Sequence, residues 1–400
     1  MTDGNKDDGT DKNTKYTRRK AIIILGSFFL ILGFIWLLYY IFIAQFEEYT
    51  DDAYVNGNVV ELMPQVSGTI TEISADDTQF VSQGETIIRL DPADTLTALQ
   101  GREAELAETV RKVRQYYENA ERVDAELTRS RADLVKAELD LKRRVGLVGD
   151  RAISREEMQH FQAALQTAEA NYQATLRNLR VARALVENSH LYTHPEVERA
   201  KANLKVAYLN YHRINILAPV SGYVAKRGAQ VGQHVNTNTP MLAIVPLDQV
   251  WIDANYKESQ LNHLRVGQPV TISADAYSDI SYHGKVVGLN AGTGAAFALL
   301  PPQNATGNWI KIVQRLPVRI IIDPDELKKN PLEIGLSMRV TTNTHHRNGN
   351  RLAVASPAKP LYFTDVYAKQ LANVDTLIMK ILQDNSSDLF LPKLEKRTNG

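Results

Sequence analysis

Two distant segments of the chain are similar in sequence: VVELMPQVSGTITEISADDTQFVSQGETIIRLDP at residues 59–92 and ILAPVSGYVAKRGAQVGQHVNTNTPMLAIVPL at residues 216–247. In each, a Val-Ser-Gly triplet precedes short runs in which apolar and polar residues alternate, which is typical of β-strands. Gly68 and Gly222 close the triplets, where we expect tight turns with positive φ. Neither half is long enough to bury a core alone, so we predict one small β-sandwich built from both halves.

The residues between these halves have the pattern of a long helical hairpin. On a first arm, apolar residues recur every seven positions at Leu99, Leu106, Val113, Ala120, Leu127, Leu134 and Leu141. A second arm carries the same spacing at Met158, Leu165, Tyr172, Leu179 and Val186. This repeat predicts a coiled coil. At 1.5 Å per residue, the first arm at residues 93–145 would reach roughly 80 Å.

Turn and cap signals divide the hairpin into segments. Gly146 and Gly149 lie between the arms, where a turn is expected. Ser154 with Glu157 three residues later is a capping box for the second arm. The second arm is interrupted before Pro195, which suits the first turn of a new helical segment that continues to about residue 213.

Residues 21–44, AIIILGSFFLILGFIWLLYYIFIA, contain no charge and are long enough to span a membrane. The run is too long for the apolar region of a cleaved signal peptide, so we predict a retained anchor. Four basic residues precede it within residues 15–20, and four acidic residues follow it within residues 47–52. The positive-inside rule then predicts that residues 1–20 are a cytoplasmic stub and that the chain beyond Gln45 lies on the other side.

The rest of the chain divides into a β-rich region and a tail. Alternating runs between residues 249 and 345 predict a β-barrel domain. In the tail, residues 346–400, an amphipathic helix is predicted by an apolar stripe at Leu371, Val374, Ile378, Ile381 and Leu382. The expected mixed α and β architecture is a stub (1–20), a transmembrane helix (21–44), a sandwich in two halves (55–92 plus 214–248), an inserted hairpin (93–213), the barrel (249–345) and the tail (346–400).

Composition excludes several classes of function. The 46 basic residues balance the 46 acidic ones, which argues against binding to nucleic acid. The chain has no cysteine, so disulfides, thiolate metal sites and a cysteine nucleophile are excluded. His190 and His194 are four residues apart, but no Glu follows His190, so we predict a protonatable surface pair rather than zinc ligands. No nucleophile–base signature is present, and we predict no catalytic residue, no metal and no cofactor.

The chain resembles the HlyD-like membrane fusion proteins, and among them the EmrA-type periplasmic adaptors of drug efflux. The resemblance rests on four segments: Val66-Ser67-Gly68, Ala218-Pro219-Val220-Ser221-Gly222, Val250-Trp251-Ile252-Asp253-Ala254-Asn255, and GTGAAFALLPPQNATGNWIKIVQ at residues 292–314. It implies that the two similar segments form a lipoyl-like domain opened by the hairpin. The hairpin occupies the place of the modified lysine of a true lipoyl carrier, so we predict neither lipoylation nor biotinylation.

The resemblance also implies a function. Such adaptors are anchored in the bacterial inner membrane by one helix, with the bulk of the chain in the periplasm. They link an inner-membrane drug transporter, here of the major facilitator type, to a TolC-like outer-membrane channel, and they assemble as homo-oligomers, here of three or six copies. In related adaptors the hairpin tip meets the channel through the pattern Arg-x3-Leu-x6-Ser, which this sequence carries at Arg143, Leu147 and Ser154.

Three other functions remain open at this stage. An adaptor of a type I protein secretion system would share the same architecture. A membrane-anchored periplasmic hydrolase would use the β-rich region, and a fragment beginning at Gln45 would then turn over an ester or glycan. A lipoyl-bearing enzyme subunit would carry an acylated lysine that an intact mass measurement would reveal.

Overall fold

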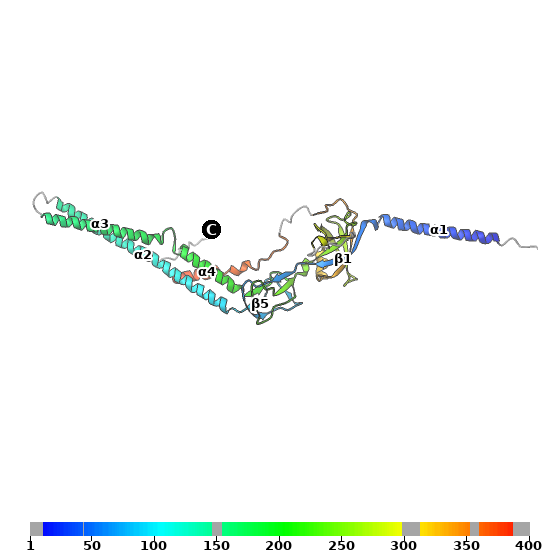
Figure 1. Ribbon diagram of the computed structural model, residues 1–400, viewed down its shortest axis with the longest axis horizontal. Coiled ribbons are helices and arrows are strands. Elements are labelled where there is room, and N and C mark those ends of the chain that lie inside the picture. The colour runs from blue at the N-terminus through cyan, green and yellow to red at the C-terminus, as the bar shows by residue number, and fades with distance from the viewer. Residues whose placement is uncertain (1–10, 43, 146–153, 298–312, 353–359, 387–400) are drawn as a thin grey trace, which may run out of the picture.

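The computed structural model describes residues 11–42, 44–145, 154–297, 313–352 and 360–386. The molecule is elongated, and its parts follow one another along its length (Figure 1). The apolar helix α1 projects from one end, a β-barrel follows it, a β-sandwich lies next, and the helical hairpin forms the other end.

Helix α1 (Asp11–Phe42) contains residues 21–42 of the membrane anchor predicted at 21–44. In the described part of the chain it is the one helix long and apolar enough to cross a membrane, with a candidate span at Ile22–Phe46. None of the most apolar window is buried by the rest of the chain. Leaving so many large apolar side chains in water would be unfavourable, so a bilayer is the environment that suits this helix.

The barrel is closed, with the strand order β1-β10-β13-β12-β11-β14. Its strands are β1 (Glu47–Asn56), β10 (Trp251–Lys257), β11 (Pro269–Ala274), β12 (Ser281–Leu289), β13 (Arg315–Ile322) and β14 (Ser337–Asn343). The 3-10 helix η3 (Leu247–Gln249) precedes β10, η4 (Gly294–Ala296) follows β12, and the short helix α5 (Pro324–Lys329) follows β13. Inside the barrel, the hydroxyls of Tyr256 and Thr342 are hydrogen-bonded at 2.7 Å, which satisfies two polar groups in an apolar core.

Strand β1 differs from the expectation that the barrel lies within residues 249–345 and that the sandwich begins at residue 55. It pairs with β10 on one side and β14 on the other, so Val55 and Asn56 belong to the barrel. The alternation that would reveal this strand is weak, because a bulge between Thr50 and Ala53 interrupts the register. Its acidic residues also resemble an ordinary membrane flank.

The sandwich consists of two four-stranded sheets, with the orders β2-β9-β7-β4 and β6-β5-β3-β8. The first half supplies β2 (Val60–Leu62), β3 (Gly68–Ile73), β4 (Phe80–Val81) and β5 (Thr86–Leu90). The second half supplies β6 (Asn215–Leu217), β7 (Gly222–Ala225), β8 (His234–Val235) and β9 (Leu242–Val245). Each sheet therefore contains strands from both halves, which confirms the predicted split sandwich.

The two halves also repeat their turns. The N–H of Thr78 donates to the carbonyl of Val224 at 2.9 Å, and the N–H of Gly232 donates to the carbonyl of Ile70 at 2.8 Å. Thr78 and Gly232 both have positive φ, at 72° and 85°. The expectation of positive φ at Gly68 and Gly222 is wrong, since neither is among the positive-φ residues described. A side chain at Gly222 would instead meet the carbonyl oxygen of Val245 at 2.6 Å, so this position needs glycine for close backbone approach.

The hairpin is formed by α2 (Ala93–Val145), α3 (Arg155–Ala184), the 3-10 helix η2 (Leu191–Thr193) and α4 (Pro195–His212). The predicted coiled-coil seam is confirmed: every residue of both seven-residue series is buried or half-buried. Pro195 opens α4, as expected. The prediction for His194 is wrong, because its ring is only 6% exposed and caps α4 by accepting from the N–H of Glu196 at 3.2 Å.

The amphipathic helix of the tail, α6 (Val374–Asn385), packs beside α2 and α4 after the 3-10 helix η5 (Ala368–Leu371). Three side chains of α6 share one apolar cluster with residues of α2 and α4: Val374, Ile378 and Leu382. The Lys205 amine and the Asp375 carboxylate are 2.7 Å apart at its start. We call this three-helix region, at the sandwich end of the hairpin, the hairpin base.

Replacing Gly222 by alanine is expected to lower the free energy of unfolding by about 1–3 kcal/mol, because the added methyl group would meet backbone rather than a movable side chain. Urea unfolding of the detergent-solubilised chain measures this loss. Gly228→Ala is the matched control, since the nearest atoms there are 3.9 Å away. Equal stability of the two variants would contradict the argument.

Replacing Ile378 by alanine is expected to weaken the docking of α6 by about 2–5 kcal/mol, because this side chain is 3% exposed and fills the apolar cluster of the hairpin base. Hydrogen exchange of the α6 amides should then become faster while α2 keeps its protection. Met379→Ala, at a position that is 41% exposed, should leave the exchange unchanged. Fast exchange of α6 in the unaltered protein would show that the helix is not docked.

Candidate partner-contact site

Near the tip of the hairpin, at the end of α2, two arginines contact the same carboxylate, that of Asp140. Nη2 of Arg143 lies 3.1 Å from the carboxylate of Asp140, and Nη1 of Arg144 lies 3.6 Å from it. Nη1 of Arg144 also donates to the backbone carbonyl of Asp140 at 3.2 Å. The guanidinium of Arg144 lies over the ring of Phe161 on the opposite arm, 3.8 Å from its centroid. This cation–π contact joins the two arms where the described part of α2 ends.

The three residues of the predicted tip motif differ in how far the structure describes them. The side chain of Arg143 is 71% exposed, so most of its guanidinium is accessible to a partner. Ser154 is exposed and caps α3, because its hydroxyl accepts from the N–H of Glu157 at 3.0 Å. The serine half of the predicted capping box is thus present. Leu147 lies outside the described residues.

An exposed stripe that the sequence analysis missed leads along α2 to Arg143. Val135 is 44% exposed and Leu139 is 50% exposed, and with Arg143 they are spaced four residues apart. Residues at this spacing lie on one side of a helix. The stripe lies outside the coiled-coil seam, which contains Leu134 and Leu141. Two apolar residues at this spacing on an otherwise polar face were the signal that could have identified it.

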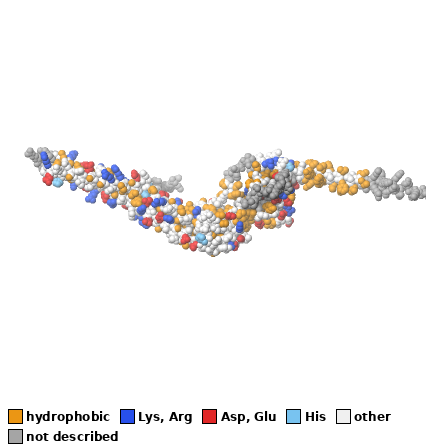
Figure 2. All heavy atoms as spheres, in the orientation of Figure 1, with side chains coloured by type: hydrophobic (Ala, Val, Ile, Leu, Met, Phe, Trp, Pro, Cys, Tyr) orange, Lys and Arg blue, Asp and Glu red, His pale blue; other side chains and the backbone are white. Residues whose placement is uncertain are grey.

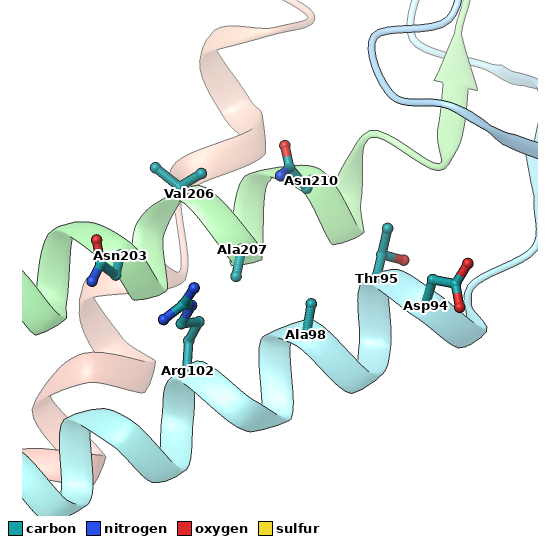
Figure 3. Close-up of a pocket in the computed structure, with 8 residues that line it drawn as sticks. All are labelled: Asp94, Thr95, Ala98, Arg102, Asn203, Val206, Ala207 and Asn210. Carbon is teal, nitrogen blue, oxygen red and sulfur yellow. The ribbon is translucent and has the colours of Figure 1, made fainter. Parts of the chain in front are cut away.

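Near the hairpin base, α2 and α4 border a groove of about 340 Å³ (Figure 3). It is lined by Asp94, Thr95, Ala98 and Arg102 of α2 and by Asn203, Val206, Ala207 and Asn210 of α4. The side chain of Val206 is 59% exposed, so the groove has an accessible apolar rim. Its small residues and scattered amides form a contact surface rather than a set of catalytic groups.

An ion pair links α2 and α4 near the start of α4. The Lys112 amine lies 3.0 Å from the Glu196 carboxylate. This hydrogen bond raises the pKa of Lys112 and lowers the pKa of Glu196. Because the lysine side chain is more than half exposed, water screens the attraction, and the pair serves mainly to align the helices.

Titratable groups do not gather into a metal site in the described ranges, where no three His, Asp or Glu side chains lie close enough to hold an ion. His283 makes a 2.8 Å contact with Glu326, and His263 makes a 2.9 Å contact with Glu48. Each is a pair at the surface of the barrel, without a third ligand.

Two family models match the chain. The model described as the EMRA alpha-helical hairpin domain matches residues 93–214, and the model described as the CusB-like beta-barrel domain matches residues 249–296. The first therefore covers the three hairpin helices, and the second begins just before β10.

Curated relatives match over most of the chain. The multidrug export protein EmrA of Escherichia coli is 42% identical over 356 residues, which span 89% of this chain and 90% of the relative. The fatty acid resistance protein FarA of Neisseria gonorrhoeae is 40% identical and covers 83% of this chain and 85% of its own. The solved structure of the periplasmic adaptor protein EmrA aligns at 20% identity with a TM-score of 0.38, over 75% of this chain and 99% of that one.

The stability of the hairpin base is expected to fall on acidification, because burial lowers the pKa of His212 below its ordinary value of 6.5. The ring lies 4.3 Å from that of Tyr208. Below pH 6.5 the unfolded chain gains a proton that the folded chain takes up only at lower pH, so stability decreases as pH falls through this window. Above pH 6.5 both states are neutral, and the contribution vanishes.

Urea unfolding of the full chain at pH 7.5 and at roughly pH 5.5 measures this effect. The His212→Gln variant should lose less stability on acidification than the unaltered protein. His160→Gln, at an exposed position on α3, should behave like the unaltered protein. An identical pH response of all three proteins would exclude His212 as the group responsible.

Proposed function

Because the chain belongs to the EmrA family of membrane fusion proteins, the adaptors of multidrug efflux pumps, we propose that it links an inner-membrane transporter of the major facilitator class to a TolC-like outer-membrane channel. In this proposal the chain transports nothing by itself and catalyses no reaction. It forms the periplasmic connection through which the cargo passes between the two membrane proteins.

The single observation that supports this function best is the placement of the hairpin and the membrane helix at opposite ends of one elongated molecule (Figure 1). Helix α2 has 53 residues, which correspond to about 80 Å of rise. A rod of this length adds little to the core of the sandwich from which it emerges. Its reach suits contact with a partner far from the anchoring membrane.

The charges that flank α1 support the proposed orientation. With the basic residues of the stub retained in the cytoplasm, the barrel, sandwich and hairpin lie in the periplasm. The single-pass anchor then holds the barrel beside the transporter, and the hairpin extends toward the outer membrane.

We propose that the hairpin tip contacts the channel through Arg143, Leu147 and Ser154. The exposure of Arg143 supports this role, since its guanidinium can donate to carboxylates or carbonyls of a partner. The stripe formed by Val135 and Leu139 supplies apolar area beside it. The contact between Arg144 and Phe161 would hold the two arms in register below this surface.

The assembly is proposed to contain three or six copies arranged around the conduit, because a channel with three-fold symmetry favours matching numbers. The groove between α2 and α4 offers a surface for a neighbouring copy. The cargo is proposed to be small drug molecules rather than a polypeptide, in line with the multidrug export protein and fatty acid resistance protein among the relatives. No observation specifically favours a hydrolase or a type I secretion system.

Arg143→Asp is expected to abolish drug resistance while expression stays normal, because it replaces the proposed donor with a like charge for an acidic partner. Cells lacking the native adaptor would be complemented with each variant, and their growth measured against increasing drug concentration. Leu147→Asp should give the same loss.

Arg131→Asp is the matched control, since this residue is also an exposed arginine of α2 but lies three turns before the tip. It should retain resistance. Full resistance of the Arg143 and Leu147 variants, together with normal cross-linking to the channel, would refute the tip assignment.

A further inference from the structure

The barrel begins where the membrane span ends. The candidate span reaches Phe46, and β1 starts at Glu47, the next residue. The 3-10 helix η1 (Ala44–Phe46) forms the last three residues of this span. With α1 in a bilayer, the start of β1 lies at its surface, because adjacent Cα atoms are about 3.8 Å apart. The end of the barrel next to Glu47 therefore faces the lipid headgroups, whichever side of the membrane the barrel occupies.

Arg347, which follows the last barrel strand β14, is bonded to the linker between α1 and β1. Its Nη2 donates to the carbonyl of Gln45 at 3.0 Å, and its Nε donates to the carbonyl of Thr344 at 3.1 Å. The guanidinium lies 5.3 Å from the centroid of the Phe46 ring. The N–H of Thr344 also donates to the carbonyl of Phe46 at 2.7 Å. The segment after β14 is thus bonded directly to the membrane-proximal linker.

Two segments meet beside this linker, residues 261–268 (LNHLRVGQ) and residues 344–351 (THHRNGNR), which we call the rim loops. The N–H of Val266 donates to the carbonyl of Asn350 at 2.9 Å. The Gln268 side chain donates to the carbonyl of His346 at 2.9 Å. These bonds hold the rim loops together as one surface.

The rim loops contain three arginines, three histidines and no acidic side chain: Arg265, Arg347, Arg351, His263, His345 and His346. Blue and pale blue side chains gather at the end of the barrel beside the apolar helix (Figure 2). Acidic residues also border this surface: Glu258 lies three residues before the first rim loop, and Glu47 and Glu48 begin β1. The carboxylate of Glu48 is already engaged, at 2.9 Å from the His263 ring and 3.1 Å from the Gln260 side chain.

We propose that the rim loops bind the phosphate groups of anionic phospholipids in the leaflet where α1 ends. Guanidinium groups match phosphate oxygens in geometry and charge. The anchor keeps the rim loops at the surface, so headgroups are present at high effective concentration without any separate binding event. Arg351 and the half-buried Arg265, whose Nη1 also donates to the carbonyls of Asn262 and Leu264, contact lipid, while Arg347 keeps the loops facing the bilayer.

Hydrogen exchange of the full chain in nanodiscs tests this proposal. One set of discs contains phosphatidylcholine alone. The second set contains equal amounts of phosphatidylcholine and phosphatidylglycerol. The amides of the rim loops should exchange roughly fivefold more slowly with phosphatidylglycerol, the factor expected for one basic residue held at an anionic surface. Added salt should reduce this difference.

The variant Arg265→Gln/Arg351→Gln should lose the difference between the two kinds of disc. A purely structural effect of these substitutions would change exchange equally in both. The matched control is Lys328→Gln/Lys329→Gln on α5, which removes two charges at the opposite end of the barrel and should keep the difference.

Three results would overturn the proposal. The first is equal exchange of the rim loops in both kinds of disc. The second is the same protection by inorganic phosphate in phosphatidylcholine discs, which would indicate a site for a free anion. The third is protection that requires a co-reconstituted transporter, which would make the rim loops a protein-binding surface.

Discussion

The hydrogen bonds between the two halves of the sandwich are the constraint on which the rest of the molecule depends. Strand β2 pairs with β9, β3 with β8, β4 with β7 and β5 with β6, so partners come from opposite sides of the hairpin. Helix α2 must therefore leave the sandwich, and helix α4 must return to it, at nearly the same place. An antiparallel rod satisfies this requirement, and its length can change without disturbing the pairing.

The periodic parts of this structure could be predicted from the sequence because their signals are local. The seven-residue series predicted the seam of the hairpin, and the similar segments predicted one sandwich shared between two halves. Pro195 and Ser154 marked helix starts because their chemistry suits those positions in any context. At the tip, the exposure of Arg143 could be expected from the polar face on which it lies.

The remaining features depend on contacts between residues far apart in the chain. Strand β1 joins the barrel through partners about 200 and 290 residues away, and no local pattern reveals them. The apolar stripe of α6 predicted a helix, but it did not predict that this helix packs against α2 and α4. His194 resembled a surface residue until the fold brought Leu185 within 2.9 Å of its ring. Thr78 adopts positive φ although its side chain disfavours that conformation. The hydrogen bond from its N–H to the carbonyl of Val224, in the other half of the sandwich, holds it there.

The attachment of β1 determines how the molecule would respond to tension. A pull on the membrane helix would enter the barrel through β1 and through the bonds of Thr344 and Arg347 to Phe46 and Gln45. Both edges of this strand are bonded, to β10 and to β14. The load would act parallel to the strand and across many hydrogen bonds at once, rather than breaking them one after another. Tension on the membrane anchor would thus be shared by the hydrogen bonds on both edges of β1.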